Sequence, residues 1–587
     1  MSEDSGDGAM EPFLTTESER EEVTRAAPQT DISEPGPPDP PSDTTPPSTV
    51  AQTVVADAVE HFQALEDPFA PAPDADALTS SFFDFEYLAE FEEIEGYWVN
   101  PPYAYVSIVY DPETEDRRYV VVEPELAPFE AHLRDDVAGM LRETLLNENI
   151  DETTDRSAVL DERIRSLLEE YAPDSDAATV HKIRYYLQRD FTGLGKIDPL
   201  MYDRRIEDIS CDGVGIPVFV YHQEYRDLET NVRYEKEELN SFVIRMAQRS
   251  GKHLSVADPM VDTSLPDGSR VQMTLGEEIS PRGSNFTIRQ FADVPHTPID
   301  LVKWGTFSVE QMAYLWLCIE NNMSLVFAGG TASGKTTSMN AVSMFIPRNT
   351  KVITIEDTLE ITLPHKNWIR GLTRDSTAAD GQGKIDMYDL LQAALRQRPE
   401  YLLVGEVRTD PEVALSFFQA MATGHTAYTT FHADSVQTVL SRLQNPPLDI
   451  PEQMIQELDI VAIQKQIYRD DKRVRRNMTI SELAPGERGI ARTPIFSWDG
   501  ETDTFSRENE STNLAEIRRL RGWSEARLQT ALDRRERLLT FLVENDVVQY
   551  ERFMAALNRF RTAGEQFVDR IDAGDVDAET FTRESER

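Results

Sequence analysis

The sequence predicts an α/β protein with a parallel sheet in its second half and a mixed α and β region before it. Apolar strand-like runs alternate with helical periodicity between Leu325 and Thr423, which is typical of a parallel sheet covered by helices on both faces. A glycine-rich loop joins the first of these strands to the first helix. Upstream, hairpin-like strands mix with amphipathic helices, which indicates a separate α+β domain.

In the second half, we expect strands where apolar and β-branched residues run together, and helices where apolar residues recur every three or four positions. The expected strands are Leu325–Ala328, Val352–Ile355 and Tyr401–Val404. The expected helices are Thr336–Phe345, Met387–Arg396, Val413–Thr423, Ser524–Glu544 and Tyr550–Ile571.

The same patterns predict the elements of the first half. The expected strands are Tyr97–Val99, Tyr103–Tyr110, Tyr119–Val122 and Phe286–Phe291, with short strands and turns from Ile206 to Val220. The expected helices are Phe129–Leu146, Val159–Tyr171, Val180–Phe191 and Lys236–Arg249, with a short amphipathic piece around Val54–Leu65.

These elements divide the chain into five expected parts. Residues 1–80 are acidic and proline-rich, and we expect them to be disordered because they bury too little apolar surface to offset their ordering entropy. Residues 81–294 form the α+β domain, and 295–300, with Pro295 and Pro298, form a linker. Residues 301–505 hold the parallel sheet, and 506–587 form a helical C-terminal extension.

The composition is strongly acidic, with a formal net charge of -47 from 105 acidic residues against 58 Lys and Arg. The acidity runs along the whole chain, which favours adaptation to very high salt, where repulsion is screened within a few ångströms. An acidic surface that repels partners is the alternative interpretation. Neither offers the basic footprint of a nucleic-acid-binding protein, so we expect no nucleic-acid partner.

We expect neither a targeting signal nor a membrane-spanning segment. Residues 1–25 lack the apolar core of a signal peptide, and no window approaches eighteen uninterrupted apolar residues. Cys211 and Cys318 are too few for a disulfide framework. We therefore expect a cytoplasmic protein that could dock on a membrane partner.

A phosphate-binding loop is the strongest motif. Gly329 to Thr336 reads GGTASGKT and matches GxxxxGK[ST], with a strand before it and a helix after it. Glycines let backbone N–H groups converge on phosphate oxygens, and the helix N-terminus adds a positive dipole end. Lys335 would reach the β- and γ-phosphates, and Thr336 would offer its hydroxyl to magnesium. The expected nucleotide-binding residues are Gly329, Gly330, Thr331, Ala332, Ser333, Gly334, Lys335, Thr336 and Thr337.

Acidic residues follow two later strands. Leu402–Arg408 is an apolar strand ending in Gly405-Glu406, and Val352–Glu360 carries Glu356, Asp357 and Glu360. Beside a phosphate loop, carboxylates at strand ends can hold magnesium through water or act on the attacking water. Acids on a solvated loop are the alternative interpretation of each cluster.

Two histidines, His425 and His432, lie in one segment of a chain that has only nine. A histidine facing the γ-phosphate could report whether that group is present. A metal site would need further ligands, which this segment lacks, and a core histidine with one hydrogen bond remains open for either.

In this order, the four segments resemble the secretion ATPase superfamily that powers type II secretion, type IV pili and the archaellum. Its Walker A loop, aspartate box, Walker B strand ending in Gly-Glu and histidine box resemble Gly329–Thr336, Ile355–Glu360, Leu402–Arg408 and Thr423–His432. Ile206–Gly213 and Gly283–Arg289 look like the archaeal branch. Together with the acidic composition, this suggests a halophilic archaeon.

The resemblance implies a RecA-like P-loop ATPase domain and roles for individual residues. Glu356 would polarise the attacking water, with Asp357 or Glu360 as alternatives, and Glu406 would hold magnesium through water. His432 or His425 would contact the γ-phosphate. Arg270 and Arg289 resemble arginines that reach the nucleotide from the N-terminal domain; surface arginines neutralising an acidic chain are the other interpretation.

The resemblance further implies a homohexamer that hydrolyses ATP with Mg²⁺ at the cytoplasmic face of the membrane. It would act on a polytopic platform protein and, indirectly, on pilin-like subunits of a pilus, archaellum or secretion pseudopilus, with a slight preference for the pilus. A DNA-translocating ATPase is one alternative, although Arg473–Arg476 is only a short basic patch without interleaved aromatics. An ATP-binding scaffold without turnover is the other.

Overall fold

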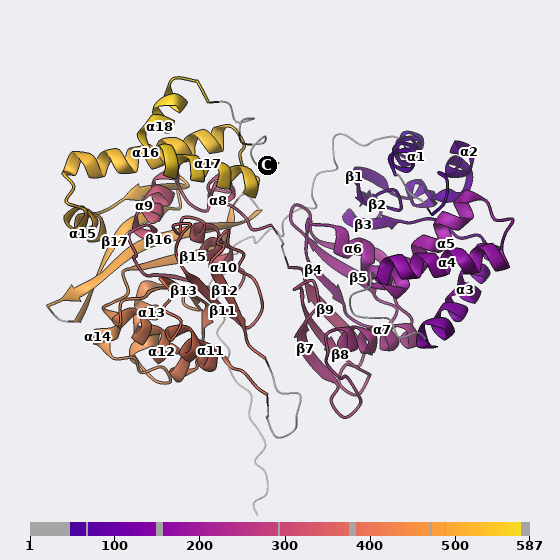
Figure 1. Ribbon diagram of the computed structural model, residues 1–587, viewed down its shortest axis with the longest axis horizontal. Helices are drawn as coiled ribbons and strands as arrows, with labels where there is room; N and C mark the ends of the chain where they lie inside the picture. Colours follow the sequence, from indigo (N-terminus) through magenta and orange to yellow (C-terminus); the bar gives the residue numbers. More distant parts are fainter. Residues whose placement is uncertain are drawn as a thin grey trace, which may run out of the picture. The chain divides into compact units, whose positions relative to one another are not determined.

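The architecture contains two nine-stranded sheets, each covered by helices (Figure 1). It comes from a computed structural model that describes residues 47–65, 69–147, 156–291, 294–374, 383–469, 472–487, 489–576 and 581. The expected mixed α/β class with an α+β first half is confirmed.

The first sheet is built mainly from antiparallel pairs. Its order is β1-β2-β3-β6-β5-β4-β9-β8-β7, and the β3–β6 pair is parallel. The strands are β1 Glu92–Asn100, β2 Ala104–Asp111, β3 Asp116–Val122, β4 Ile206–Cys211, β5 Pro217–His222, β6 Arg226–Arg233, β7 Met260–Ser264, β8 Arg270–Thr274 and β9 Asn285–Arg289.

The helices of the first half pack into separate apolar clusters. They are α1 Pro47–Ala64, α2 Ala75–Ala77, α3 Pro128–Asn147, α4 Arg156–Tyr171, α5 Ala177–Phe191, α6 Asp198–Tyr202 and α7 Lys236–Arg249. Leucine, isoleucine and valine side chains of α3, α4 and α5 form one cluster. The apolar face of α7 packs instead against the sheet, in a cluster with Phe286 and Ile288 of β9.

Helix α1 covers most of the amphipathic piece expected around Val54–Leu65 and begins earlier, at Pro47, inside the range that was expected to be a disordered tail. Its apolar residues Val50, Val54, Ala58 and Phe62 recur every four positions, so they form one helical face. That face is buried in a cluster that includes side chains of β2 and β3. The expectation of disorder up to residue 80 is therefore wrong for residues 47–65 and 69–80, while residues 1–46 and 66–68 lie outside the described residues.

The second sheet is parallel over its first six strands, in the order β12-β11-β13-β14-β10-β15. It then continues through antiparallel β16, β17 and β18, an extension the sequence patterns did not predict. The strands are β10 Leu325–Gly329, β11 Val352–Glu356, β12 Trp368–Leu372, β13 Tyr401–Val407, β14 Thr426–Phe431, β15 Ile460–Arg469, β16 Lys472–Gly486, β17 Gly489–Asp499 and β18 Thr504–Arg507.

Alternate side chains of the central strands enter two different cores, because successive residues of a strand point to opposite faces. In β10, Leu325 and Phe327 join one cluster, whereas Val326 and Ala328 join the other. The first cluster is covered by α9 Val309–Ile319, α10 Lys335–Ser343 and the C-terminal helices; the second by α11 Met387–Leu395, α12 Pro411–Ala422 and α13 Val436–Gln444. Two shorter helices are α8 Pro298–Lys303 and α14 Glu452–Ile455.

The C-terminal helices share the core of the second sheet. They are α15 Thr512–Arg521, α16 Glu525–Glu544, α17 Tyr550–Ala563 and α18 Glu565–Asp572. The ring of Trp316 on α9 stacks on Phe345, with centroids 4.9 Å apart, and meets Phe560 of α17 at 4.8 Å. The single helix expected over Tyr550–Ile571 is interrupted at Gly564, whose φ of 52° favours glycine and ends α17.

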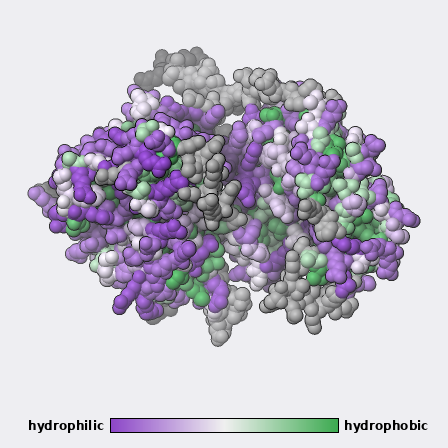
Figure 2. Space-filling view, turned by 45° about the horizontal axis from the view of Figure 1, so that its top comes forward, coloured by the Kyte–Doolittle hydropathy of each residue, from purple (hydrophilic) through white to green (hydrophobic). Residues whose placement is uncertain are grey.

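The surface reflects the acidic composition. In the view of Figure 2, hydrophilic residues cover most of the described surface. Among the described residues, no helix is long and apolar enough to cross a membrane.

A buried carboxylate fastens the C-terminal helices to the sheet. Glu482 of β16 is 1% exposed and accepts hydrogen bonds from Tyr314 Oη (2.7 Å) and Thr512 N (2.7 Å). It also accepts from the Ser511 hydroxyl and from Asn513 N (3.2 Å), so it caps the start of α15.

We therefore expect Glu482→Ala to destabilise the protein by about 3 kcal/mol or more, because several hydrogen bonds to one buried charge are lost together. Thermal unfolding of the variant should show a clearly lower midpoint than the wild type. Glu501→Ala, which removes an exposed carboxylate, is the matched control. Equal midpoints for the two variants would contradict the capping role.

Candidate active site

The phosphate loop leaves the carboxyl end of β10 and enters α10. Because β10 pairs in parallel with β14 and β15, the loop lies at the edge where the parallel strands end. A Cβ at position 329 would lie 2.4 Å from the Gln464 carbonyl oxygen, so only glycine fits where the loop begins. Gly334 has a φ of 85°, a left-handed conformation that glycine adopts without strain, and it caps α10.

Lys335 reaches back across the loop. Its ammonium group donates a 2.7 Å hydrogen bond to the carbonyl oxygen of Gly330. Burial lowers the pKa of Lys335, and the nearby carboxylates of Glu406 and Glu360 act in the opposite direction. The first-turn N–H groups of α10 have no acceptor within the helix, so the loop and helix start form an anion-binding site beside this ammonium.

Glu356 is a buried carboxyl at the end of β11. Its side chain is 1% exposed, and Oε1 accepts hydrogen bonds from the backbone N–H groups of Glu360 (2.8 Å) and Ile361 (2.9 Å). Oε2 is also buried, yet it has no hydrogen-bond partner within the described residues. Burial raises the pKa of this carboxyl to about 7. A fixed carboxyl with one free oxygen and a pKa near neutrality suits a general base.

Glu406 ends the neighbouring strand, β13. Because β11 and β13 are parallel and pair Ile355 with Val404, Glu356 and Glu406 lie at the same edge of the sheet. A Cβ at position 405 would lie 3.5 Å from Glu356 Cγ, so this glycine faces the buried carboxyl. Arg408 Nε donates to Glu406 Oε2 at 2.7 Å and leaves the other oxygen available. Because these strands are parallel, both predicted carboxylates lie at the edge of the sheet that carries the phosphate loop.

The other two candidate bases are placed differently. Asp357 is exposed and accepts a hydrogen bond from the Thr373 hydroxyl at 3.0 Å. Glu360 is partly exposed and lies 3.7 Å from a guanidinium nitrogen of Arg289. Of the three acids, only Glu356 combines deep burial with a free oxygen.

The two histidines lie at opposite ends of β14. His432 follows the strand, and its Nδ1 lies 2.9 Å from the Gly329 carbonyl oxygen at the start of the phosphate loop. His425 precedes the strand, and its Nδ1 contacts the Ala420 carbonyl oxygen at 3.2 Å. Since parallel strands carry the loop at their carboxyl ends, His432 lies at the site and His425 does not.

The two predicted arginines lie opposite each other on neighbouring strands, because β8 and β9 pair Arg270 with Arg289. Arg270 makes a two-pronged ion pair with Asp262, at 3.1 and 2.6 Å. Arg289 is largely exposed and pairs only loosely with Glu360. Glu360 therefore links the Arg289 guanidinium to the loop that follows Glu356.

Sequence reasoning missed two residues that support the loop. Arg475 of β16 donates from Nε to the Ala332 carbonyl oxygen at 3.0 Å. Gln464 of β15 is fully buried and donates to the Ser338 hydroxyl of α10 at 2.5 Å. The arginine-rich run at 473–476 was the available signal for Arg475, but its strand was not predicted.

The donors at this edge fit magnesium held together with nucleotide phosphates. Thr336 and Glu406 offer one hydroxyl and one carboxylate, and Mg²⁺ commonly takes few protein ligands with phosphates and water. Among the described residues, no group of three His, Cys, Asp or Glu side chains could hold a metal ion by itself. Magnesium bound here would neutralise charge on the phosphates.

Two protein families match parts of this chain. Residues 219–567 match the family described as Type II/IV secretion system protein, and residues 54–125 match the family described as PilB3-like, N-terminal. An uncharacterised protein of Methanocaldococcus jannaschii is 38% identical over 377 residues, which cover 63% of this chain and 68% of that protein.

More distant relatives include named secretion proteins. Protein VirB11 of Agrobacterium fabrum is 28% identical over 248 residues, covering 38% of this chain and 70% of VirB11. The solved structure of the Legionella pneumophila ATPase DotB is 19% identical and covers 72% of this chain and 98% of DotB. The TM-score of this match is 0.35.

The raised pKa of Glu356 predicts a pH dependence of stability. The folded nucleotide-free protein holds a proton that the unfolded chain releases above its ordinary pKa of 4.5. The resulting stabilisation, about 3 kcal/mol, is fully present below pH 4.5 and lost as the pH rises through about 7.

We therefore expect Glu356→Gln to remove this loss of stability at higher pH. The difference in free energy of unfolding between variant and wild type, followed by denaturant titration, should shift in favour of the variant as the pH rises from 5 to 8. Glu501→Gln removes an exposed carboxylate that is not among the causes of the Glu356 shift, and it is the control. A difference for Glu356→Gln that is independent of pH would contradict the assigned pKa.

Proposed function

Since this chain belongs to the type II/IV secretion system ATPase family, we propose that it is the hexameric motor that drives assembly of a type IV pilus-like filament. The chain is an ATPase of this family. The observation that carries the proposal is the meeting of Lys335, Glu356 and Glu406 at one edge of the parallel sheet.

Each of these residues has one task in the proposed reaction. Lys335 and the N–H groups of the phosphate loop bind the triphosphate. Glu356 uses its free Oε2 to accept a proton from the attacking water, while the N–H groups of Glu360 and Ile361 hold the carboxylate in place. Glu406 would hold Mg²⁺ through water, and the ion would supply positive charge that neutralises the phosphates.

Two contacts would change when the γ-phosphate is lost. His432 hydrogen bonds to the loop at Gly329, so a change in the phosphates can alter the end of β14. Arg289 faces Glu360, and Glu360 N–H holds Glu356, so this arginine is placed to respond to the same event. Arg270 and Arg289 would swing the first sheet toward the nucleotide, with the hinge near Pro295–Pro298.

The partners follow from the family and remain part of the proposal. A ring of six copies at the cytoplasmic face of the membrane would push on a polytopic platform protein, which would in turn extract pilin-like subunits. We favour a pilus over an archaellum or a secretion pseudopilus, and a halophilic archaeon as the source.

Phosphate release by the purified chain tests the reaction. Lys335→Ala should bind ATP poorly and show no turnover, because it lacks the ammonium group that contacts the phosphates. Glu356→Gln should still bind ATP but turn it over about 10²–10⁴-fold more slowly, because the amide cannot accept a proton. Asp357→Asn and Glu360→Gln are matched controls at the neighbouring acids. Wild-type turnover by Glu356→Gln would remove this residue from the base role.

The arginines are tested separately. If Arg289 stabilises charge on the transferring phosphate, Arg289→Ala should lower kcat by about 10³-fold or more, with a smaller change in nucleotide affinity. Arg270→Ala should be compared with Asp262→Ala. If Arg270 acts only through its ion pair with Asp262, the two variants should have the same kcat. An unchanged kcat in Arg289→Ala would return this residue to a surface role.

A further inference from the structure

A basic cleft lies away from the phosphate loop, between the helices of the first half. Its volume is about 930 Å³, within the range of small-molecule sites. It lies between the end of α3, the end of α5 with the following turn, and one face of α7. The charged residues lining it are Arg134, Arg142, Arg189, Lys196, Arg245, Arg249, Asp135, Asp190 and Glu238.

Cations outnumber carboxylates two to one in this lining, in a chain whose acids outnumber its cations by 105 to 58. The three lining carboxylates are already paired. Asp135 pairs with Arg134 at 2.6 Å, Asp190 with Arg189 at 3.1 Å, and Glu238 with Lys196 at 2.7 Å. The remaining positive charge therefore belongs to Arg142, Arg245 and Arg249.

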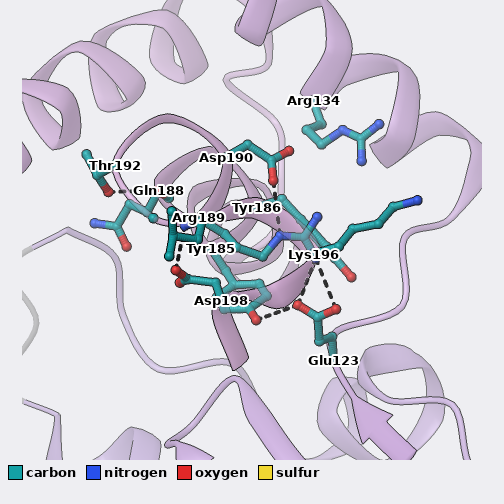
Figure 3. A network of polar contacts seen from close by, with 12 residues as sticks. Glu123, Arg134, Tyr185, Tyr186, Gln188, Arg189, Asp190, Thr192, Lys196 and Asp198 are labelled. Atoms are coloured by element: carbon teal, nitrogen blue, oxygen red, sulfur yellow. Dashed lines mark hydrogen bonds and ion pairs between the residues drawn. The ribbon is translucent and has the colours of Figure 1, made fainter. Parts of the chain in front are cut away.

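Figure 3 shows how the paired side of the cleft is built. The buried guanidinium of Arg189 is held between Glu123, at 2.8 Å, and Asp190. Arg134 and Lys196 lie on one side of this pair, and both line the cleft. The charge of Arg189 is thus balanced by its own carboxylate partners, and its side chain forms part of the cleft wall in a fixed position.

The unpaired arginines stand on opposite walls. Arg142 of α3 is exposed, with its guanidinium 5.8 Å from the centre of the Phe191 ring, and Arg245 of α7 is exposed as well. Within the described residues, neither has a hydrogen bond or ion pair. Arg249 of α7 donates to the backbone carbonyl oxygens of Gly193 and Phe191, and no carboxylate of the described chain forms an ion pair with it.

Repulsion between cations inside the cleft also favours the binding of an anion. Burial lowers the pKa of Arg249, the positive charge of Arg245 lowers it further, and Asp198 acts in the opposite direction. Tyr234, which also lines the cleft, is 2% exposed, and its hydroxyl has no hydrogen-bond partner in the described structure. Groups that repel one another or lack partners cost free energy unless a ligand of opposite charge is bound.

We propose that this cleft binds a small phosphorylated ligand with at least two phosphate groups. Guanidinium groups present paired donors that match phosphate oxygens, and three of them lack a carboxylate partner here. The ligand would join two separate cores, because α3 and α5 pack in one apolar cluster and α7 packs in another. It therefore holds the three-helix layer against the first sheet.

Pyrophosphate is the probe, titrated into the full chain by calorimetry with a chelator present to keep magnesium away. The wild type should show two binding events, and Lys335→Ala should lose the one at the phosphate loop. Arg142→Gln combined with Arg245→Gln should weaken the other by about tenfold or more, since two charge-assisted contacts are lost. Both arginines are exposed and unpaired among the described residues, so the variant should unfold at the wild-type temperature.

Arg282→Gln is the matched control, an exposed arginine of the same half that does not line the cleft. It should retain both events. The proposal is overturned if the wild type shows only the event that Lys335→Ala removes. It is also overturned if the second event survives unchanged in the double variant, or weakens equally in Arg282→Gln, which would indicate a response to net charge alone.

Discussion

The buried carboxyl of Glu356, held at the end of a parallel strand, is the constraint on which the site depends. Two backbone N–H groups fix one of its oxygens, and the sheet buries the other without a partner in the described structure. Such a group is costly in a resting protein and is retained where chemistry needs it. Parallel pairing of the strands is then enough to place Glu406 and the phosphate loop at the same edge of the sheet.

Much of this site could be predicted because it follows from local patterns and one rule of sheet geometry. The phosphate loop is a run of consecutive residues, and the strands before Glu356 and Glu406 are short and mostly apolar. Once the strands are parallel, their carboxyl ends must meet. The choice between His425 and His432 needed β14, the parallel strand between them, which the sequence analysis did not predict.

What could not be predicted depends on contacts between distant segments. The antiparallel extension β16–β18 mixes charged and apolar residues, so neither its strands nor the support of Arg475 for the phosphate loop was apparent. The sequence indicated a short amphipathic piece around Val54–Leu65, but neither the start of α1 at Pro47 nor the packing of its four apolar residues against β2 and β3 could be predicted from it. The basic cleft likewise combines arginines about a hundred residues apart in a chain whose overall charge points the other way.

A structure of the chain with Mg²⁺ and a non-hydrolysable ATP analogue tests the central claim most directly. We expect the γ-phosphate against the Lys335 ammonium and a water molecule within hydrogen-bonding distance of both Glu356 Oε2 and the line of attack on that phosphate. A water held instead by Asp357 or Glu360, with Glu356 still closed away from the nucleotide, would contradict the account.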